Sequence, residues 1–288
     1  MVATLRTRED ARTLKHIEDV DKLKDIAREV RRNILLMTTA AGSGHPGGSM
    51  SATDILTVLY FNVMRHDPGN PTWPARDRFV LSKGHAAPAL YCMLAEAGYF
   101  SKDLLMSLRK LGSPLQGHPD MKRLPGIEMS TGSLGQGLSV AVGMALAARL
   151  DGLDYHVYAL IGDGESQEGQ VWEAAMAASH NRLDNLTAIL DENRLQIDGP
   201  TEKVMSVPNQ RARWKAFGWD AHVLDGHDMG SLIKLLHKSP EPGTPRMLVA
   251  QTVKGKGVSF MENQLKYHGT PLSQKELERA LKELGGAS

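Results

Sequence analysis

Hydrophobic residues in the second half of the chain form short continuous runs, and these alternate with segments that follow the helical period. The apolar runs lie near residues 155–161, 186–191, 220–224 and 246–252. The helical segments lie near residues 170–182, 208–217 and 228–238. Runs of this length without polar alternation are typical of strands buried on both faces. The pattern therefore predicts an α/β fold, with a doubly wound, mostly parallel sheet covered by helices on both faces.

The first half of the chain is predicted to be mainly helical. Residues 20–40 follow the helical period and end at a glycine-rich segment, 42–48. A second helix is expected to start near Ser51, after these glycines. Further on, the pattern predicts a strand over 77–82, a loop rich in glycine and proline over 112–133, and a helix of small residues over 135–149.

The sequence predicts a single domain preceded by a short arm. Residues 1–18 are charged and unpatterned, so we expect an N-terminal arm there. Residues 19–288 are expected to form one domain with a C-terminal extension. Ser273 and Glu276 have the spacing of a capping box, which predicts the start of a last, charged helix.

Composition and charge exclude several classes of protein. Hydrophobic residues make up 41% of the 288 residues and charged residues 23%, as in ordinary soluble enzymes. The net charge of +1 provides no attraction for nucleic acid or an anionic membrane, so we expect neither partner. The single cysteine, Cys92, lies in an apolar helical pattern and is expected to be a small buried residue. With no apolar run long enough to span a bilayer and no secretory signal, we expect a cytoplasmic protein.

Two of the predicted strands end in oxygen-bearing side chains. The run near 155–161 is followed by Gly162-Asp163-Gly164, and the run near 186–191 is followed by Glu192-Asn193. Ligands of parallel sheets bind beyond the carboxyl ends of the strands, so Asp163 and Asn193 should lie side by side there. Mg²⁺ is commonly held by one or two carboxylates together with phosphate oxygens. Glycine beside Asp163 allows the backbone to approach a phosphate closely. The pattern predicts a site for a metal ion and a diphosphate.

Four of the eleven histidines lie beside glycine in predicted loops, namely His45, His85, His118 and His268. Loops on a rigid scaffold are where binding groups concentrate, and histidine can exchange a proton near neutral pH. His227, by contrast, is interpreted as an ordinary loop histidine. The segment from Lys254 to Gly257 is either a phosphate-binding turn or a solvated basic turn.

Several motifs together carry a resemblance to a known family. They are A-A-G-S-G-H-P-G-G-S, L-S-K-G-H-A, G-H-P-D, S-T-G-S-L-G-Q-G-L-S, G-D-G-E-S-Q-E-G-Q-V-W-E-A, D-N-R-L-Q-I-D-G and T-V-K-G-K-G-V-S-F-M-E-N. From about Arg31 to Leu272, the chain resembles the N-terminal, diphosphate-binding domain of the transketolase family. The G-D-G motif is shared by all thiamine-diphosphate enzymes, whereas the two G-H-P loops and S-T-G-S-L-G-Q-G are more specific to the sugar-handling branch. The resemblance implies thiamine diphosphate as cofactor and the fold of its diphosphate-binding (PP-type) domain.

The resemblance also implies roles for individual residues. Asp163, Asn193 and the carbonyl of Leu195 would hold Mg²⁺ or Ca²⁺. The remaining contacts to the cofactor would come from His85, Gly132, Leu134, Gly162, Gly164, Ile197 and His268. Of these, Leu134 and Ile197 would sandwich the thiazolium ring. The residues implied in catalysis are His45, His118 and His268, along the donor-sugar channel, and Glu168, which would pair with a glutamate across a subunit interface.

The resemblance implies a ketol transfer between sugar phosphates in the cytoplasmic pentose phosphate pathway. No part of this sequence matches the family's pyrimidine-binding domain. We therefore expect one half of a split transketolase that acts only with a C-terminal partner subunit, as an α2β2 assembly. Two alternatives remain: the α subunit of a 2-oxo-acid dehydrogenase E1 component, and a non-catalytic subunit that binds thiamine diphosphate for regulation.

Overall fold

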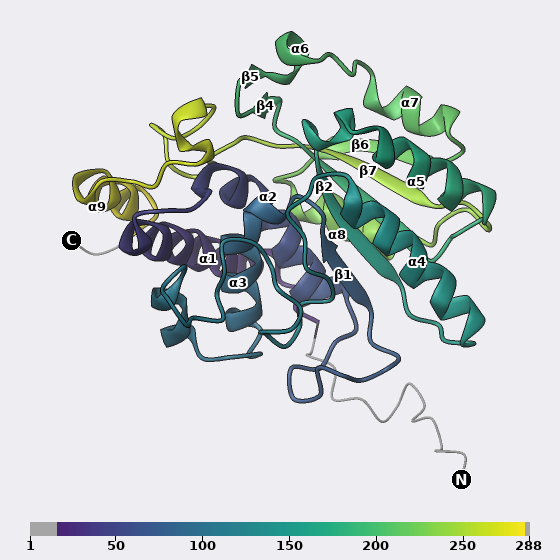
Figure 1. Cartoon of the computed structure of the whole chain (residues 1–288), viewed down its shortest axis with the longest axis horizontal. Coiled ribbons are helices and arrows are strands. Elements are labelled where there is room, and N and C mark those ends of the chain that lie inside the picture. Colours follow the sequence, from purple (N-terminus) through teal and green to yellow (C-terminus); the bar gives the residue numbers. More distant parts are fainter. Residues whose placement is uncertain (1–15, 286–288) are drawn as a thin grey trace.

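The structure, a computed structural model, describes residues 16–285 and contains a five-stranded parallel sheet. The strand order is β1-β2-β3-β7-β6, and every neighbouring pair is parallel (Figure 1). The strands are β1 (Arg78–Leu81), β2 (Val157–Gly162), β3 (Leu186–Glu192), β6 (Asp220–Asp225) and β7 (Arg246–Gln251). The predicted parallel α/β sheet is confirmed.

Helices cover both faces of this sheet, as the pattern predicted (Figure 1). The α-helices are α1 (Val20–Ala41), α2 (Pro46–Val58), α3 (Ala87–Glu96), α4 (Gln136–Leu150), α5 (Gly169–His180), α6 (Thr201–Val204), α7 (Gln210–Ala216), α8 (Met229–His237) and α9 (Gln274–Glu283). Helices α1, α2, α3 and α8 contribute to one apolar core, and α4, α5 and α7 contribute to the other. A small antiparallel pair, β4 (Leu195–Gln196) and β5 (Gly199–Pro200), lies beyond the end of β3.

Successive residues of each central strand belong to different cores. In β2, Leu160 packs in the core of α1, α2 and α3, while its neighbours Ala159 and Ile161 pack in the core of α4 and α5. In β3, Ile189 and Leu190 divide in the same way. Because side chains of a strand alternate between its faces, a sheet covered on both sides needs apolar residues at every position. This explains the continuous apolar runs.

The helix expected near Ser51 begins earlier, so that prediction was wrong by about one turn. Helix α2 starts at Pro46, with His45 at the N-cap position, and its first turn includes Gly47 and Gly48. Proline suits the first turn because its fixed φ is helical and its missing N–H has no intrahelical partner there. The glycines are required by close packing, since a Cβ on Gly47 would lie 2.8 Å from the carbonyl oxygen of Tyr267. Tertiary contact thus outweighs the low helix propensity of glycine.

The first and the last α-helix of the described region both have side-chain caps at their N-termini. The capping box of Ser273 and Glu276 is present and opens α9, as predicted. Helix α1 starts at Val20, and the side chain of Asp19 caps it. Most of the expected arm, residues 1–15, lies outside the described residues, so the domain boundary stays a prediction.

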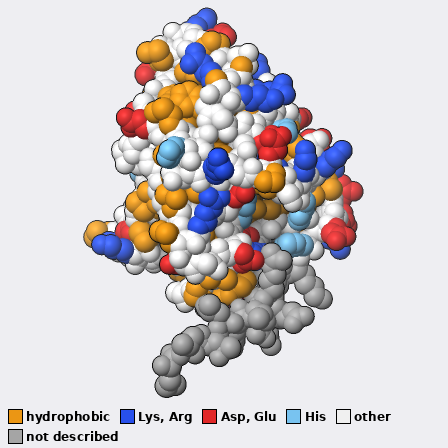
Figure 2. All heavy atoms as spheres, turned by 90° about the vertical axis from the view of Figure 1, so that its right-hand side faces the viewer, with side chains coloured by type: hydrophobic (Ala, Val, Ile, Leu, Met, Phe, Trp, Pro, Cys, Tyr) orange, Lys and Arg blue, Asp and Glu red, His pale blue; other side chains and the backbone are white. Residues whose placement is uncertain are grey.

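The mixture of acidic and basic side chains on the surface is consistent with the net charge of +1. On the face turned toward the viewer in Figure 2, hydrophobic side chains form several separate groups among Lys or Arg and Asp or Glu side chains. None of the described helices combines the length and apolar character needed to cross a bilayer.

Candidate active site

The carboxyl ends of β2 and β3 bring the predicted oxygen ligands together. Gly162 is aligned with Asp191 in the parallel register, so Asp163 follows β2 where Asn193 follows β3. One carboxylate oxygen of Asp163 accepts the backbone N–H of Arg194, and the other accepts that of Gly164 at 2.8 Å. The expectation that the two strand ends lie side by side is confirmed.

A cavity of about 320 Å³ opens over these strand ends. It is lined by ten of the residues named from the sequence: His85, Leu134, Gly162, Asp163, Gly164, Glu168, Asn193, Leu195, Ile197 and His268. The other three, His45, His118 and Gly132, lie next to it through the histidine cluster. A larger cavity of about 620 Å³ shares Asn193 and Leu195 but has no histidine in its lining. We therefore place the chemistry in the smaller cavity.

Four segments that are distant in the sequence bring the four glycine-flanked histidines into one cluster; His85 and His268 lie in short 3₁₀ helices, Gly84–Ala86 and Leu265–His268, rather than in the predicted loops. The ring of His45 lies at its centre, with centroid distances of 5.5 Å to His85, 6.2 Å to His118 and 5.7 Å to His268. His85 and His268 stack on each other at 5.3 Å. A Cβ on Gly132 would lie 3.1 Å from the ring of His118, so glycine there allows the loop to approach this histidine. The sequence indicated these residues, but only the fold brings them together.

The cluster keeps its imidazoles uncharged at neutral pH. Burial, with the charge of Arg109 next in importance, lowers the pKa of His45 to about 4. Burial and the nearby Lys254 lower the pKa of His268 to about 3. The pKa of His118 is also lowered, by burial and by Arg109. A neutral imidazole has one donor and one acceptor nitrogen, so each of these side chains can donate one hydrogen bond and accept another.

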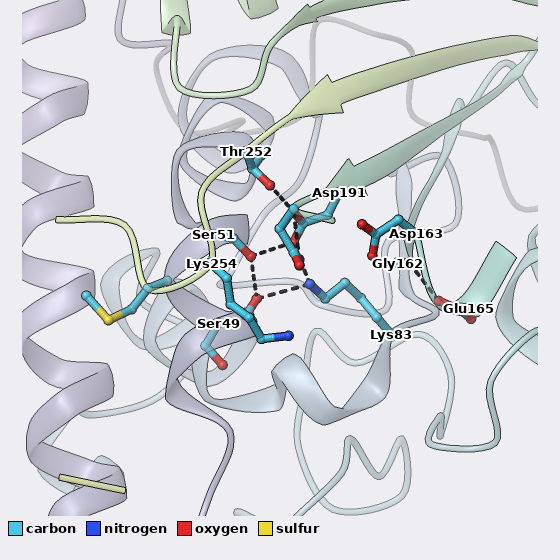
Figure 3. A network of polar contacts seen from close by, with 12 residues as sticks. Ser49, Ser51, Lys83, Gly162, Asp163, Glu165, Asp191, Thr252 and Lys254 are labelled. Carbon is cyan, nitrogen blue, oxygen red and sulfur yellow. Dashed lines mark hydrogen bonds and ion pairs between the residues drawn. The ribbon is translucent and has the colours of Figure 1, made fainter. Parts of the chain in front are cut away.

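Two buried lysines lie at the base of the cavity; Lys83 was not recognised from the sequence, and Lys254 belongs to the turn for which two interpretations were left open. Lys83 follows β1, and its Nζ lies 2.5 Å from Oδ2 of Asp191 and 3.1 Å from the carbonyl oxygen of Gly48 (Figure 3). Lys254 follows β7, and its Nζ lies 3.0 Å from the carbonyl oxygen of Leu195 and 2.9 Å from Nδ1 of His268. Their position at strand ends was the signal available in the sequence. For Lys254, the solvated basic turn is excluded because the side chain is 1% exposed.

Burial also changes the titration of the charged groups in the cavity. Desolvation, together with the neighbouring Asp191, raises the pKa of Asp163 to about 6. Desolvation and the charge of Lys83 lower the pKa of Lys254 to about 8. Asp191 shows the opposite balance: burial alone would raise its pKa, but Lys83 and hydrogen bonds from Ser51 and other donors lower it overall. Asp191 therefore remains a charged partner for Lys83.

A third buried carboxylate, Glu165, organises the loop that presents Leu134. Its oxygens accept the N–H groups of Gly135 and Gly162, both at 2.9 Å, and the hydroxyl of Ser82 at 2.5 Å. These contacts join α4, β2 and the end of β1 at one carboxylate. Glu165 was not recognised from the sequence, although it stands two residues after Asp163.

The apolar and acidic residues named from the sequence lie at the mouth of the cavity. Leu134 and Ile197 are 37% and 68% exposed, which is high for large apolar side chains beside a cavity. Glu168 is also exposed, at the N-cap position of α5. Exposure of this kind at a cavity mouth fits residues that a ligand or a further polypeptide would cover.

Adjacent strand ends with paired oxygen-bearing side chains, next to buried lysines, form a site suited to a diphosphate and its cation. With the parallel sheet, this site places the fold in the class of thiamine-diphosphate-binding domains. The family model described as "Transketolase, thiamine diphosphate binding domain" matches residues 24–287. The chain therefore belongs to the transketolase family.

Similar proteins include chains of about the same length and longer chains, of which this chain covers less than half. The chain is 46% identical, over 91% of its length and 96% of the relative, to a 6-deoxy-6-sulfo-D-fructose transketolase subunit of Clostridium sp. (strain MSTE9). It is 45% identical to an apulose-4-phosphate transketolase subunit of Phocaeicola vulgatus, over 92% of this chain and 94% of the relative. The crystal structure of transketolase from Campylobacter jejuni superimposes with a TM-score of 0.87 at 35% identity, covering 93% of this chain and 43% of that one.

Proposed function

We propose that this chain is the N-terminal subunit of a two-chain transketolase. The enzyme would transfer a two-carbon ketol unit from a ketose phosphate to an aldose phosphate, with thiamine diphosphate as cofactor. The observation that carries the proposal is the meeting of four histidines over a diphosphate site at the ends of β2 and β3. The relatives of similar length are named as transketolase subunits, which favours a split enzyme.

The residues at the strand ends fit a divalent cation that is shared with a diphosphate. Among residues 16–285, no group of three His, Cys, Asp or Glu side chains could hold a metal by itself. Asp163, Asn193 and the carbonyl of Leu195 would instead supply one carboxylate, one amide and one backbone oxygen. Such an incomplete set suits Mg²⁺, which takes its remaining oxygens from phosphate and water, and Ca²⁺ accepts the same ligands.

The other contacts to the cofactor follow the shape of the cavity. Gly164 has room for only a small group, because a Cβ there would lie 3.1 Å from that of Gln196. Its backbone can therefore approach the diphosphate, with Gly162 beside it. His85 and His268 would donate to phosphate oxygens from one side. Leu134 and Ile197, both at the mouth, would enclose the thiazolium ring, and Gly132 would present its backbone to the aminopyrimidine.

Thiamine diphosphate, when bound, supplies the carbanion chemistry that breaks and forms carbon–carbon bonds. The protein must then move protons to and from sugar hydroxyls. His45, His118 and His268 are uncharged at neutral pH, so they can accept a hydroxyl proton and later return it. Acid–base assistance by a positioned side chain contributes typically about 10²–10⁴-fold in rate.

The partner subunit would carry the pyrimidine-binding domain and complete the site. Exposed Glu168 would meet a glutamate of that second chain, and we propose an α2β2 assembly in the cytoplasm. The named substrates of the two similar subunits carry an anionic group, a sulfonate or a phosphate. We propose the same class of substrate for this chain: a ketose with a terminal anion, such as xylulose 5-phosphate of the pentose phosphate pathway.

The test is a transfer assay with the chain and its partner subunit, thiamine diphosphate and Mg²⁺. We expect transfer from a ketose phosphate to an aldose phosphate by the pair and none by this chain alone. Activity of the chain alone would contradict the split site. Oxidative decarboxylation of a 2-oxo acid by the pair would support the dehydrogenase alternative, which the transketolase relatives disfavour. Cofactor binding without turnover in the complex would support a regulatory subunit.

A further inference from the structure

A buried ion pair joins Arg31 of α1 to Asp54 of α2. Asp54 also contacts His227, a histidine that the proposed mechanism does not use. Asp54 is 5% exposed and accepts two hydrogen bonds from the guanidinium of Arg31, at 2.9 and 2.6 Å. Its Oδ2 also lies 2.6 Å from Nδ1 of His227. His227 precedes α8, so three separate segments meet at this one carboxylate.

The hydrogen bonds of His227 determine which ring nitrogen carries the proton. The backbone N–H of Val253 points at Nε2 of His227, at 2.9 Å. Because a backbone N–H can only donate, Nε2 must accept, and the ring proton lies on Nδ1. The proton on Nδ1 then faces Oδ2 of Asp54. The ring therefore connects the carboxylate of Asp54 in α2 to the backbone N–H of Val253, which follows β7.

This link ends one residue before Lys254, which is labelled in Figure 3 and lines the cavity. On the other side of Lys254, the N–H of Gly255 donates to the carbonyl oxygen of Gly47 at 3.0 Å. The backbone of Lys254 is thus held on both sides by α2, directly through Gly47 and indirectly through Asp54 and His227. The same helix carries His45 at its N-cap position.

We propose that His227 is a positioning residue, which holds Lys254 in place for the diphosphate through the amide of Val253. The inference rests on the proposed function, since it takes thiamine diphosphate as the ligand. Without the acceptor at Nε2, the segment around Val253 and Lys254 would be less ordered in the free protein. The cost of ordering it when the cofactor binds would weaken the affinity. The expected loss is roughly tenfold in affinity for thiamine diphosphate, the equivalent of one ordinary hydrogen bond.

Two substitutions separate the two bonds of the ring. In His227→Asn, the amide nitrogen can occupy the position of Nδ1 and donate to Asp54, but nothing accepts the N–H of Val253. In His227→Gln, the amide oxygen can occupy the position of Nε2 and accept from Val253, but Asp54 loses its donor. A positioning role predicts weaker cofactor binding for H227N and nearly normal binding for H227Q. A purely structural role, as a partner for buried Asp54, predicts instead that H227Q is less stable than H227N. It also predicts that neither variant loses cofactor binding selectively.

The measurement is the dissociation constant of thiamine diphosphate with Mg²⁺, by fluorescence titration of the chain in complex with its partner subunit. Urea unfolding without cofactor would be measured for each variant as a check on folding. His222→Asn is the matched control, because His222 lies on β6 and contacts Asp220 rather than Val253. We expect H222N to bind like the wild type.

A double-mutant cycle with Lys254→Met tests whether the effect passes through Lys254. In the K254M background, H227N should cause little further loss of affinity, because the group that it positions is gone. Equal losses in both backgrounds would overturn the inference, as would wild-type affinity of H227N. If the wild-type complex does not bind thiamine diphosphate, the proposed function fails instead, so the two failures are distinguishable.

Discussion

The Nζ of Lys83 lies 2.5 Å from Oδ2 of Asp191, and both side chains are at most 1% exposed. This pair joins the end of β1 to the end of β3 beneath the cavity. Asp191 accepts further bonds from Ser51 at 2.6 Å and from the hydroxyl of Thr252. A buried charge with so many partners becomes costly when the partner of opposite charge is removed.

We therefore predict that Lys83→Met destabilises the chain strongly. Removing one member of a buried ion pair typically costs about 3–5 kcal/mol, because the other charge stays buried without compensation. Urea unfolding at neutral pH measures the loss. Lys24→Met is the control, since Lys24 pairs with Asp21 on the exposed face of α1 and should contribute little. Equal unfolding midpoints for K83M and K24M would contradict the prediction.

Affinity for thiamine diphosphate with Mg²⁺ should fall as the pH falls below about 6. Burial and the neighbouring Asp191 raise the pKa of Asp163 to about 6, and a protonated carboxyl cannot ligate the cation. The pKa values of His45 and His268, about 4 and 3, keep these two rings uncharged at pH 5. We expect roughly a tenfold loss of affinity per pH unit below 6, measured by fluorescence titration.

Asp163→Asn provides the comparison for that pH profile. The variant should bind thiamine diphosphate and Mg²⁺ weakly at pH 7 and show a flatter dependence between pH 7 and 5. A wild-type affinity that is the same at both pH values would show that the carboxylate of Asp163 does not ligate the cation.

The stability of the fold should also depend on His45. Its pKa is about 4 in the folded chain against 6.5 in the unfolded chain, so the unfolded state binds more protons between these values. The stability is therefore fully present above pH 6.5 and is lost as the pH falls toward 4. The ring is partly exposed, which weakens the effect through solvent screening. From pH 7.5 to 5, we expect His45→Asn to lose about 1 kcal/mol less than the wild type in urea unfolding.

Two glycines of α4 should respond to alanine in opposite directions. A Cβ on Gly137 would lie 2.6 Å from Cα of Ser82, so Gly137→Ala must displace backbone and should cost about 1–3 kcal/mol. Gly143 is exposed, and a Cβ there would meet no atom within 4 Å. Gly143→Ala should therefore stabilise the helix by about 0.5–1 kcal/mol through propensity alone. Thermal unfolding of the two variants tests the difference, and a shift of the same sign in both would contradict it.

Much of the sheet and part of the site could be predicted because their signals are local. A strand buried on both faces needs apolar residues at every position, and the runs around Leu160 and Ile189 show this without reference to any partner. The side chains that follow such strands must gather at one edge, so the strand pattern alone places Asp163 beside Asn193. Glycine next to each of the four histidines likewise indicated loops suited to binding, although their individual roles stay predictions.

The remaining features depend on contacts between residues far apart in the chain, which local patterns do not contain. Lys83 and Asp191 are 108 residues apart, and Asp54 and His227 are 173 apart. In the sequence, each is an ordinary charged or polar residue, with no local pattern that indicates its partner. The start of α2 at Pro46 has the same origin, because the glycines that disfavour a helix locally are required by packing against Tyr267. Local pattern was thus enough for the strands and for the position of the two oxygen-bearing side chains at their ends. The buried charges around them acquired their partners only when the sheet and α2 came together.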